Sequence, residues 1–172
     1  LVRAVHQEYV DAGADVIETN TFGAHRLKLG PHGFDAQVVK INREGARIAR
    51  EAAAGRALVA GAIGPVGKPL EPFGNVSVAD ARDVYGEQVQ GLVEGGVDLF
   101  LVETMPSLDQ ARAAFDAIRV HSELPIVISL TFTEEGTTFY GDKPEDVVKA
   151  AEEWGAAAVG ANCSQGPQPM LE

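Results

Sequence analysis

The sequence predicts an α/β fold in which parallel strands form the core and helices lie outside them. Helix-like and strand-like segments alternate strictly along the 172 residues. The strand-like segments are almost entirely apolar, which is typical of parallel strands that are buried on both faces. In addition, three polar residues each stand seven positions after the glycine that ends a predicted helix: Asn20, Glu103 and Asn162. Strands of equal length would bring these side chains to one rim, which favours a symmetric barrel, although the count does not exclude an open sheet.

The first third of the chain contains two helices and two strands. Residues 1–12 carry an apolar stripe at helical spacing, and the segment 15–20 follows as the first strand. Residues 25–34 should be irregular because they contain two glycines and a proline. A second apolar stripe predicts a helix over about 35–54, and the uncharged segment 57–63 is expected to be the second strand.

Two capping motifs organise the middle of the chain. The Ser-Val-Ala-Asp sequence at 77–80 resembles a capping box and starts a helix that ends at a pair of glycines, before a strand at 98–104. Ser107 and Gln110 form a second capping box, which starts the helix that precedes a strand at 125–132.

The last helix and strand lead to the only cysteine. Pro144 suits a first helical turn, and Gly155 can end the helix that it starts. The uncharged run 156–159 should be a strand buried on both faces that ends at Cys163. Glycine and prolines after it, including Pro167, predict a loop. Cys163 is therefore expected at the rim where barrel enzymes carry their chemistry.

Five strands do not close a (β/α)8 barrel, which takes eight strands and about 250 residues. The chain begins in a helix with no strand before it and stops as a rim loop begins. We therefore expect residues 1–172 to be a partial TIM barrel with five of the eight strands, lacking the first strand and the last two.

Charge and composition exclude several classes of function. The net charge of −11 argues against nucleic-acid binding, which needs clustered Lys and Arg. The uncharged runs are too short to span a bilayer, and no secretory signal is visible, so we expect no membrane partner and a cytoplasmic protein. A single cysteine excludes an internal disulfide.

The rim residues each allow a functional and a structural interpretation. Cys163 is either a small buried apolar residue or a ligand or nucleophile. Glu103 ends an apolar run, where a carboxylate is costly unless it is paired, so it either acts in the site or pairs with a basic residue. Glu18 and Asn20 share one face of their strand. The histidines show no metal-ligand spacing and are interpreted as surface residues: His6, His25, His32 and His121.

Four motifs together resemble the homocysteine S-methyltransferase family, in order and over essentially the whole chain: Glu18–Ala24 (ETNTFGA), Gly61–Pro65 (GAIGP), Val102–Thr104 (VET) and Gly160–Ser164 (GANCS). The first and last look most like the homocysteine-binding module of cobalamin-dependent methionine synthase. Each motif alone is a weak signal, whereas four in register are specific.

The resemblance implies a zinc-dependent transfer of a methyl group to the thiol of homocysteine, giving methionine. In the family, three cysteine thiolates hold Zn2+ and the homocysteine sulfur takes the open position. Cys163 matches the first ligand, and Glu103 matches the carboxylate that binds the substrate ammonium group. Asn20 and Asn162 are candidates for orienting the substrate. The family's Cys-Cys pair is absent from this sequence, so the chain alone should lack zinc and activity.

The resemblance also implies partners: homocysteine and a methyl donor or methyl-carrying module whose identity the sequence does not show. Unpaired sheet edges would favour a homo-oligomer. Two other functions remain open at this point. One is another rim-active barrel enzyme such as a carbon–carbon lyase, although no predicted strand ends in the lysine that a Schiff base needs. The other is a non-catalytic barrel fragment that assembles with a partner chain.

Overall fold

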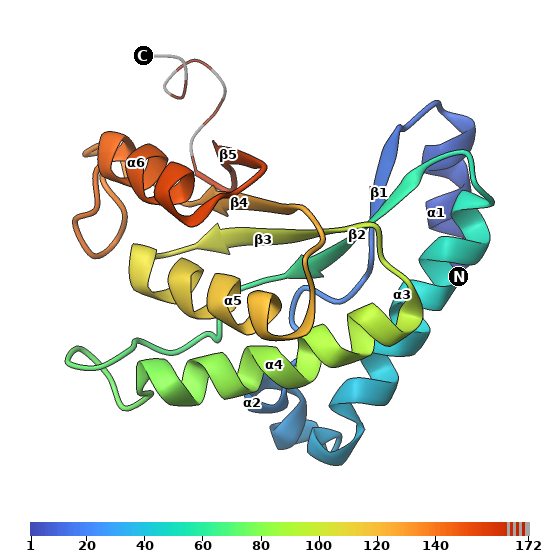
Figure 1. Ribbon diagram of the computed structural model, residues 1–172, viewed down its shortest axis with the longest axis horizontal. Helices are drawn as coiled ribbons and strands as arrows, with labels where there is room; N and C mark the ends of the chain where they lie inside the picture. The colour runs from blue at the N-terminus through green and yellow to red at the C-terminus, as the bar shows by residue number, and fades with distance from the viewer. Residues whose placement is uncertain (165, 167, 169, 171–172) are drawn as a thin grey trace.

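The computed structural model describes residues 1–164, 166, 168 and 170, and five parallel strands form its single sheet. The strands follow one another in sequence order: β1 (Val16–Glu18), β2 (Leu58–Ile63), β3 (Leu99–Met105), β4 (Ile126–Leu130) and β5 (Ala158–Ala161). This arrangement, drawn in Figure 1, confirms the predicted α/β fold with parallel strands. The loop expected around Pro167 lies partly outside the described residues.

Helix α1 (Val2–Asp11) precedes β1, and helices connect the successive strands, as predicted: α2 (Arg26–Leu29), α3 (Val38–Ala53), α4 (Val78–Gly95), α5 (Leu108–His121) and α6 (Pro144–Trp154). The segment expected to be irregular contains α2 and a 3-10 turn, η1 (Gly30–His32), and a second turn, η2 (Asp35–Gln37), precedes α3. Over the described part of the chain, no helix has both the length and the apolar character needed to cross a membrane.

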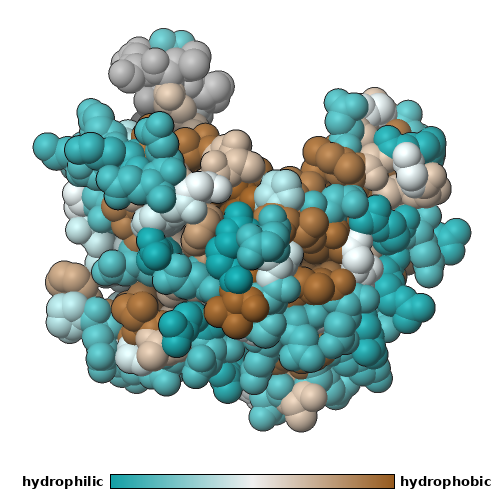
Figure 2. Space-filling model, in the orientation of Figure 1, coloured by the Kyte–Doolittle hydropathy of each residue, from teal (hydrophilic) through white to brown (hydrophobic). Residues whose placement is uncertain are grey.

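Helices cover one face of the sheet and leave the other face open. The helix-facing side chains of β1, β2 and β3 are buried, as Ile17, Val59 and Phe100 show with at most 4% exposure. On the opposite face, Val16 and Leu58 pair in register and remain 43% and 52% exposed. Figure 1 shows α3, α4 and α5 lying together on the covered side, and Figure 2 shows hydrophobic atoms exposed where the molecule is hollowed between its two ends. A sheet with one covered face has the layering of a barrel wall.

The prediction that the last strand is buried on both faces is wrong. Ala158, Val159 and Gly160 are all exposed, and β5 ends at Ala161 rather than at Cys163. The reason is the position of β5 at the edge of the sheet, where it pairs only with β4 within the described residues. An apolar, uncharged run predicts that a strand can be buried, but the burial itself depends on neighbours that the local sequence does not encode.

The two predicted capping boxes differ in the structure. Ser77 Oγ accepts a hydrogen bond from the Asp80 amide at 3.0 Å, and the Asp80 carboxylate accepts one from the Ser77 amide at 3.3 Å, so this box is complete. Ser107 Oγ accepts from the Gln110 amide at 3.2 Å, but the Gln110 side chain does not return to Ser107. Its side-chain oxygen accepts from the Val66 amide, and its nitrogen donates to the Lys68 carbonyl oxygen. These two bonds hold the loop after β2.

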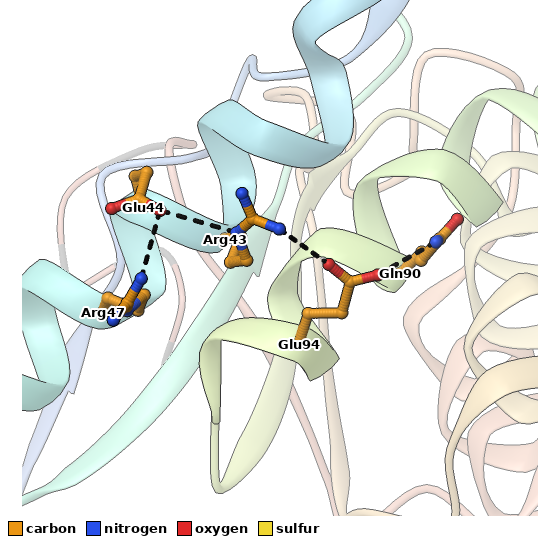
Figure 3. Close-up of polar contacts among 5 residues, drawn as sticks. All are labelled: Arg43, Glu44, Arg47, Gln90 and Glu94. Atoms are coloured by element: carbon orange, nitrogen blue, oxygen red, sulfur yellow. Dashed lines mark hydrogen bonds and ion pairs between the residues drawn. The ribbon is translucent and has the colours of Figure 1, made fainter.

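Helices α3 and α4 pack closely and carry a polar network on their exposed flank, shown in Figure 3. Arg43 contacts Glu94 at 3.4 Å and Glu44 at 3.5 Å, while Arg47 contacts Glu44 at 3.5 Å. Gln90 donates to Glu94 at 3.0 Å. Such exposed ion pairs contribute little to stability individually, so close packing beneath the network carries most of the contact energy.

Candidate functional site

Asn162 joins the carboxyl ends of β3, β4 and β5. Its Nδ2 donates to Glu103 Oε2 at 2.9 Å and to Thr104 Oγ1 at 3.0 Å. Its Oδ1 accepts from the Thr104 amide and from Ser129 Oγ, both at 3.0 Å. These four bonds use both donors and both acceptor positions of the amide. Asn162 can therefore orient its neighbours, but its side-chain amide has no free donor or acceptor left for a ligand.

Cys163 lies beside this cluster with an exposed, free thiol. Its Sγ is 3.6 Å from Thr104 Oγ1, which is itself 3.4 Å from Glu103 Oε2. The interpretation of Cys163 as a small buried apolar residue is therefore excluded. The expected convergence of Glu103 and Cys163 at one rim is present, with Thr104 between them.

The turn that carries Cys163 is fixed on both sides by strand β4 and its loop. Thr131 Oγ1 donates to the backbone oxygen of Asn162 at 3.1 Å, and the Phe132 amide donates to Ser164 Oγ at 2.9 Å. These bonds hold the backbone oxygen of the residue before the cysteine and the side chain of the residue after it. The loop after β4 therefore helps to hold the turn that carries the thiol.

Glu18 approaches the same cluster from β1. Its carboxyl lies within hydrogen-bonding reach of Glu103, two strands away, and on β2 between them stand the small residues Ala60 and Ala62. Partial burial first, and then the charge of Glu103 and the hydrogen bond with it, raise the pKa of Glu18 above its ordinary value. Sequence reasoning noted Glu18 only for sharing a face with Asn20, because a contact across two strands depends on side-chain reach.

The sequence model of the homocysteine S-methyltransferase family matches residues 1–172, the entire chain. This chain belongs to the homocysteine S-methyltransferase family. The methionine synthase of Mycobacterium tuberculosis is 32% identical over 183 residues, an alignment that covers 100% of this chain and 15% of that protein. The chain therefore spans about 15% of the length of this curated relative.

Solved structures of the family show the same fold. The apo form of the homocysteine methyltransferase MmuM from Escherichia coli superposes with a TM-score of 0.77 at 23% identity, covering 98% of this chain and 63% of that one. A structure of the same protein titled the metallated form gives a TM-score of 0.66 at 17% identity, with coverage of 98% and 81%. At these identities the likeness establishes the TIM-barrel-like fold of the family and nothing finer.

Asn20 does not join the cluster that this family member forms around Asn162. It is exposed after the end of β1 and lines a cavity of about 630 Å3 between α1 and β1, together with Glu18, His6 and Tyr9. Over the part of the chain that is described, the Asn20 side chain makes no hydrogen bond to Glu103 or Cys163. Its role in substrate orientation stays a prediction.

Two of the four histidines are not surface residues, contrary to the sequence-based interpretation. His32 and His121 are exposed, but His6 is 8% exposed and His25 is fully buried. His25 Nε2 lies 3.3 Å from the Pro65 carbonyl oxygen, and burial lowers its pKa to about 4. Within the described residues, no group of three His, Cys, Asp or Glu side chains could hold a metal ion.

Thr104 is a site residue that the sequence analysis placed in a motif but to which it gave no role. Its backbone has φ of 59°, in the left-handed region that a β-branched residue rarely adopts. The sequence signal was its position directly after Glu103 at the end of an apolar strand. Regular alternation along a strand would have sent its side chain to the opposite face from Glu103, so its presence in the site was not expected.

Proposed function

We propose that this chain supplies the homocysteine-binding part of an enzyme that transfers a methyl group to the homocysteine thiol, giving methionine. One observation carries the proposal. In a chain matched from end to end by the family, Glu103 and Cys163 meet at one rim of the sheet through Thr104. A carboxylate suits the ammonium group of homocysteine, and a cysteine thiol that can ligate zinc suits the end that carries its sulfur.

Glu103 is proposed to bind the ammonium group of homocysteine. Among the described residues, no Lys or Arg side chain forms an ion pair with Glu103, so the alternative of a structural ion pair has no support. Asn162 fixes Oε2 of the carboxylate at 2.9 Å and leaves the half-buried group facing the open side of the sheet. A carboxylate fixed in this way is a strong partner for a cation.

Cys163 is proposed to be one ligand of a zinc ion in the complete enzyme. The thiol is exposed and of the right donor type, but one thiol is not a metal site. The remaining ligands would have to come from outside the described residues, as the Cys-Cys pair of the family would. When bound, zinc keeps a coordinated thiol deprotonated at neutral pH, which is the form of homocysteine that attacks a methyl group.

The rest of the enzyme is proposed on the same grounds. The coverage of 15% of the mycobacterial methionine synthase and of 63% of the Escherichia coli structure fits a partial barrel whose other strands lie elsewhere. The methyl donor, a cytoplasmic location and a homo-oligomeric state stay predictions. The lyase alternative gains no support, because none of the five described strands contains a lysine.

Replacing Glu103 with Gln in the complete enzyme tests the proposal, because this change keeps the size of the side chain and removes its charge. A charge-assisted hydrogen bond is worth about 1.5–3 kcal/mol, so the affinity for homocysteine should fall by roughly one to two decades. Calorimetry measures this directly. Glu123→Gln is the matched control, since Glu123 is exposed before the start of β4, at the opposite end of the sheet. Unchanged affinity in Glu103→Gln would remove Glu103 from the site.

A further inference from the structure

We propose that Thr104 is a positioning residue that holds the Glu103 carboxylate and the Cys163 thiol in a fixed relation to each other. The inference rests on the proposed function and assigns a role to a residue that the family resemblance placed in a motif without giving it one. Three features of the structure support it: the contacts of the hydroxyl, an irregularity in β3, and the left-handed backbone.

The Thr104 hydroxyl lies between the two functional groups. Asn162 Nδ2 donates to Oγ1 at 3.0 Å, so the hydroxyl proton is free to point away from Asn162. Its two acceptors are Glu103 Oε2 at 3.4 Å and Cys163 Sγ at 3.6 Å, and the single proton is shared between them or points to one at a time. The Thr104 amide is also fixed, because it donates to Asn162 Oδ1 at 3.0 Å. A hydroxyl held at both its oxygen and its backbone can orient what it donates to.

Strand β3 is irregular at this point. Val102 pairs with Ile128 and Met105 with Leu130, so β3 takes three steps where β4 takes two. An extra residue of this kind is a β-bulge, which re-aims a side chain. Val102 and Met105 are both fully buried, and the Met105 sulfur lies 3.9 Å from the hydroxyl of Tyr85 on α4, on the helix side.

The bulge places two consecutive side chains on the same side of the sheet. In a regular strand, neighbours point to opposite faces, which would turn Thr104 toward the helices. Instead, Glu103 and Thr104 both contact Asn162 Nδ2 on the open side. The φ of 59° at Thr104 accompanies this turn, and glycine would adopt it with no steric cost. A threonine here adds a hydroxyl that glycine lacks, and that hydroxyl makes all three side-chain contacts of the residue.

Three substitutions in the complete enzyme separate the hydroxyl from the backbone. Thr104→Val keeps the branched shape and removes the hydroxyl, Thr104→Ser keeps the hydroxyl, and Thr104→Gly removes it while relieving the backbone. Residues that orient a metal ligand typically contribute 10–100-fold to metal affinity. We expect Thr104→Val and Thr104→Gly to weaken zinc binding by about 10–100-fold, measured by competition with a chelator. Thr104→Ser should stay within about threefold of the parent because it retains the bond.

Homocysteine affinity, measured by calorimetry on the same variants, reports on the Glu103 side of the contact. This affinity should fall by about tenfold in Thr104→Val and stay close to the parental value in Thr104→Ser. Parental affinities for zinc and homocysteine in Thr104→Val or Thr104→Gly would overturn the inference. Equal losses in Thr104→Ser, which keeps the hydroxyl, and Thr104→Val, which removes it, would overturn it too, because the loss would then not follow the hydroxyl.

Glu103→Gln and Cys163→Ala, measured in parallel, separate this inference from the function on which it rests. If these two variants lose homocysteine and zinc affinity while Thr104→Val does not, only the role of Thr104 is wrong. If both retain parental affinities, the proposed function itself is wrong.

Discussion

At the scale of single residues, buried polar side chains fix the loop that follows β1. Asn42 donates to the carbonyl oxygen of Ala24 at 2.6 Å, and Gln88 donates to that of Thr21 at 2.6 Å. His25 is fully buried in the same loop. A loop whose carbonyl groups are bonded from two helices is held in one conformation, and the one titratable group inside it makes that arrangement sensitive to pH.

We expect His25 to make the protein less stable in mild acid. The folded state keeps the ring neutral, with a pKa of about 4 against 6.5 for an unperturbed histidine. The unfolded chain binds a proton as the pH falls below 6.5, so stability is complete above that pH and is lost as the pH falls toward 4. Between pH 7.5 and pH 5 the loss attributable to His25 should be about 2 kcal/mol.

Urea unfolding of His25→Gln at the two pH values measures this contribution, because glutamine does not titrate and can still donate to the Pro65 carbonyl. The variant should lose about 2 kcal/mol less than the parent on acidification. His121→Gln, at an exposed position, is the control and should behave like the parent. A His25→Gln protein with the parental pH dependence would contradict the argument.

The site residues that the sequence located, and those it did not, differ for a physical reason. The seven-residue count placed Glu103 and Asn162 at one rim, and they are bonded to each other. The same count did not bring Asn20 into this cluster, because Asn20 follows β1, which β2 separates from β3, and it lines the cavity between α1 and β1 instead. Thr104 was given no role because a bulge breaks the alternation on which any reading of strand faces depends.

At the scale of elements, glycines set the distance between α3 and α4. A methyl group on Gly91, about one turn before the end of α4, would overlap the carbonyl oxygen of Val39 and come within 2.8 Å of Asn42 Cβ, both on α3. Gly86, on the same helix, has nothing nearer than His121 Nε2 at 3.5 Å, which is ordinary contact. On the same helix, Gly91 therefore has no room for a methyl group, whereas Gly86 does.

Alanine at these two positions should act in opposite directions. Gly91→Ala should destabilise the protein by roughly 1–3 kcal/mol, because two helix backbones must separate to admit the methyl group. Gly86→Ala should stabilise it by about 0.5–1 kcal/mol, because alanine loses less conformational entropy in a helix. Thermal unfolding distinguishes them. Equal effects from the two substitutions would show that Gly91 does not set the packing distance.

The sequence predicted where helices begin better than it predicted side-chain partners and the burial of strands. The capping motif at 77–80 and the proline at 144 mark the first turns of α4 and α6 as predicted. The second capping box is incomplete because the Gln110 side chain bonds to a loop 44 residues away. A local sequence pattern cannot show a contact over that distance. Burial of β5 failed for the same reason, since it depends on what lies beside the strand.

At the scale of the whole molecule, the two faces of the sheet are unequal. Side chains that alternate toward α3, α4 and α5 are buried, while the register partners Val16 and Leu58 on the other face are about half exposed. An open doubly wound sheet carries helices on both faces, whereas a barrel carries them on one. The structure thus favours the barrel interpretation, which the seven-residue count alone left undecided, and the open face is the side on which Glu18 and Glu103 approach each other.

This layout leads to a prediction about metal binding by the chain as a whole. Tetrahedral zinc draws three or four ligands from a protein, and its affinity comes from several deprotonated ligands held together. The described residues offer one thiol at the rim, Cys163, and no cluster of three donor side chains. We therefore expect elemental analysis of the 172-residue chain to find no stoichiometric zinc, while the complete enzyme holds one equivalent and loses it with Cys163→Ala. Tight one-to-one zinc in the short chain, or a Cys163→Ala enzyme that keeps its zinc, would show that the ligands of the metal lie elsewhere and that Cys163 has another role at the rim.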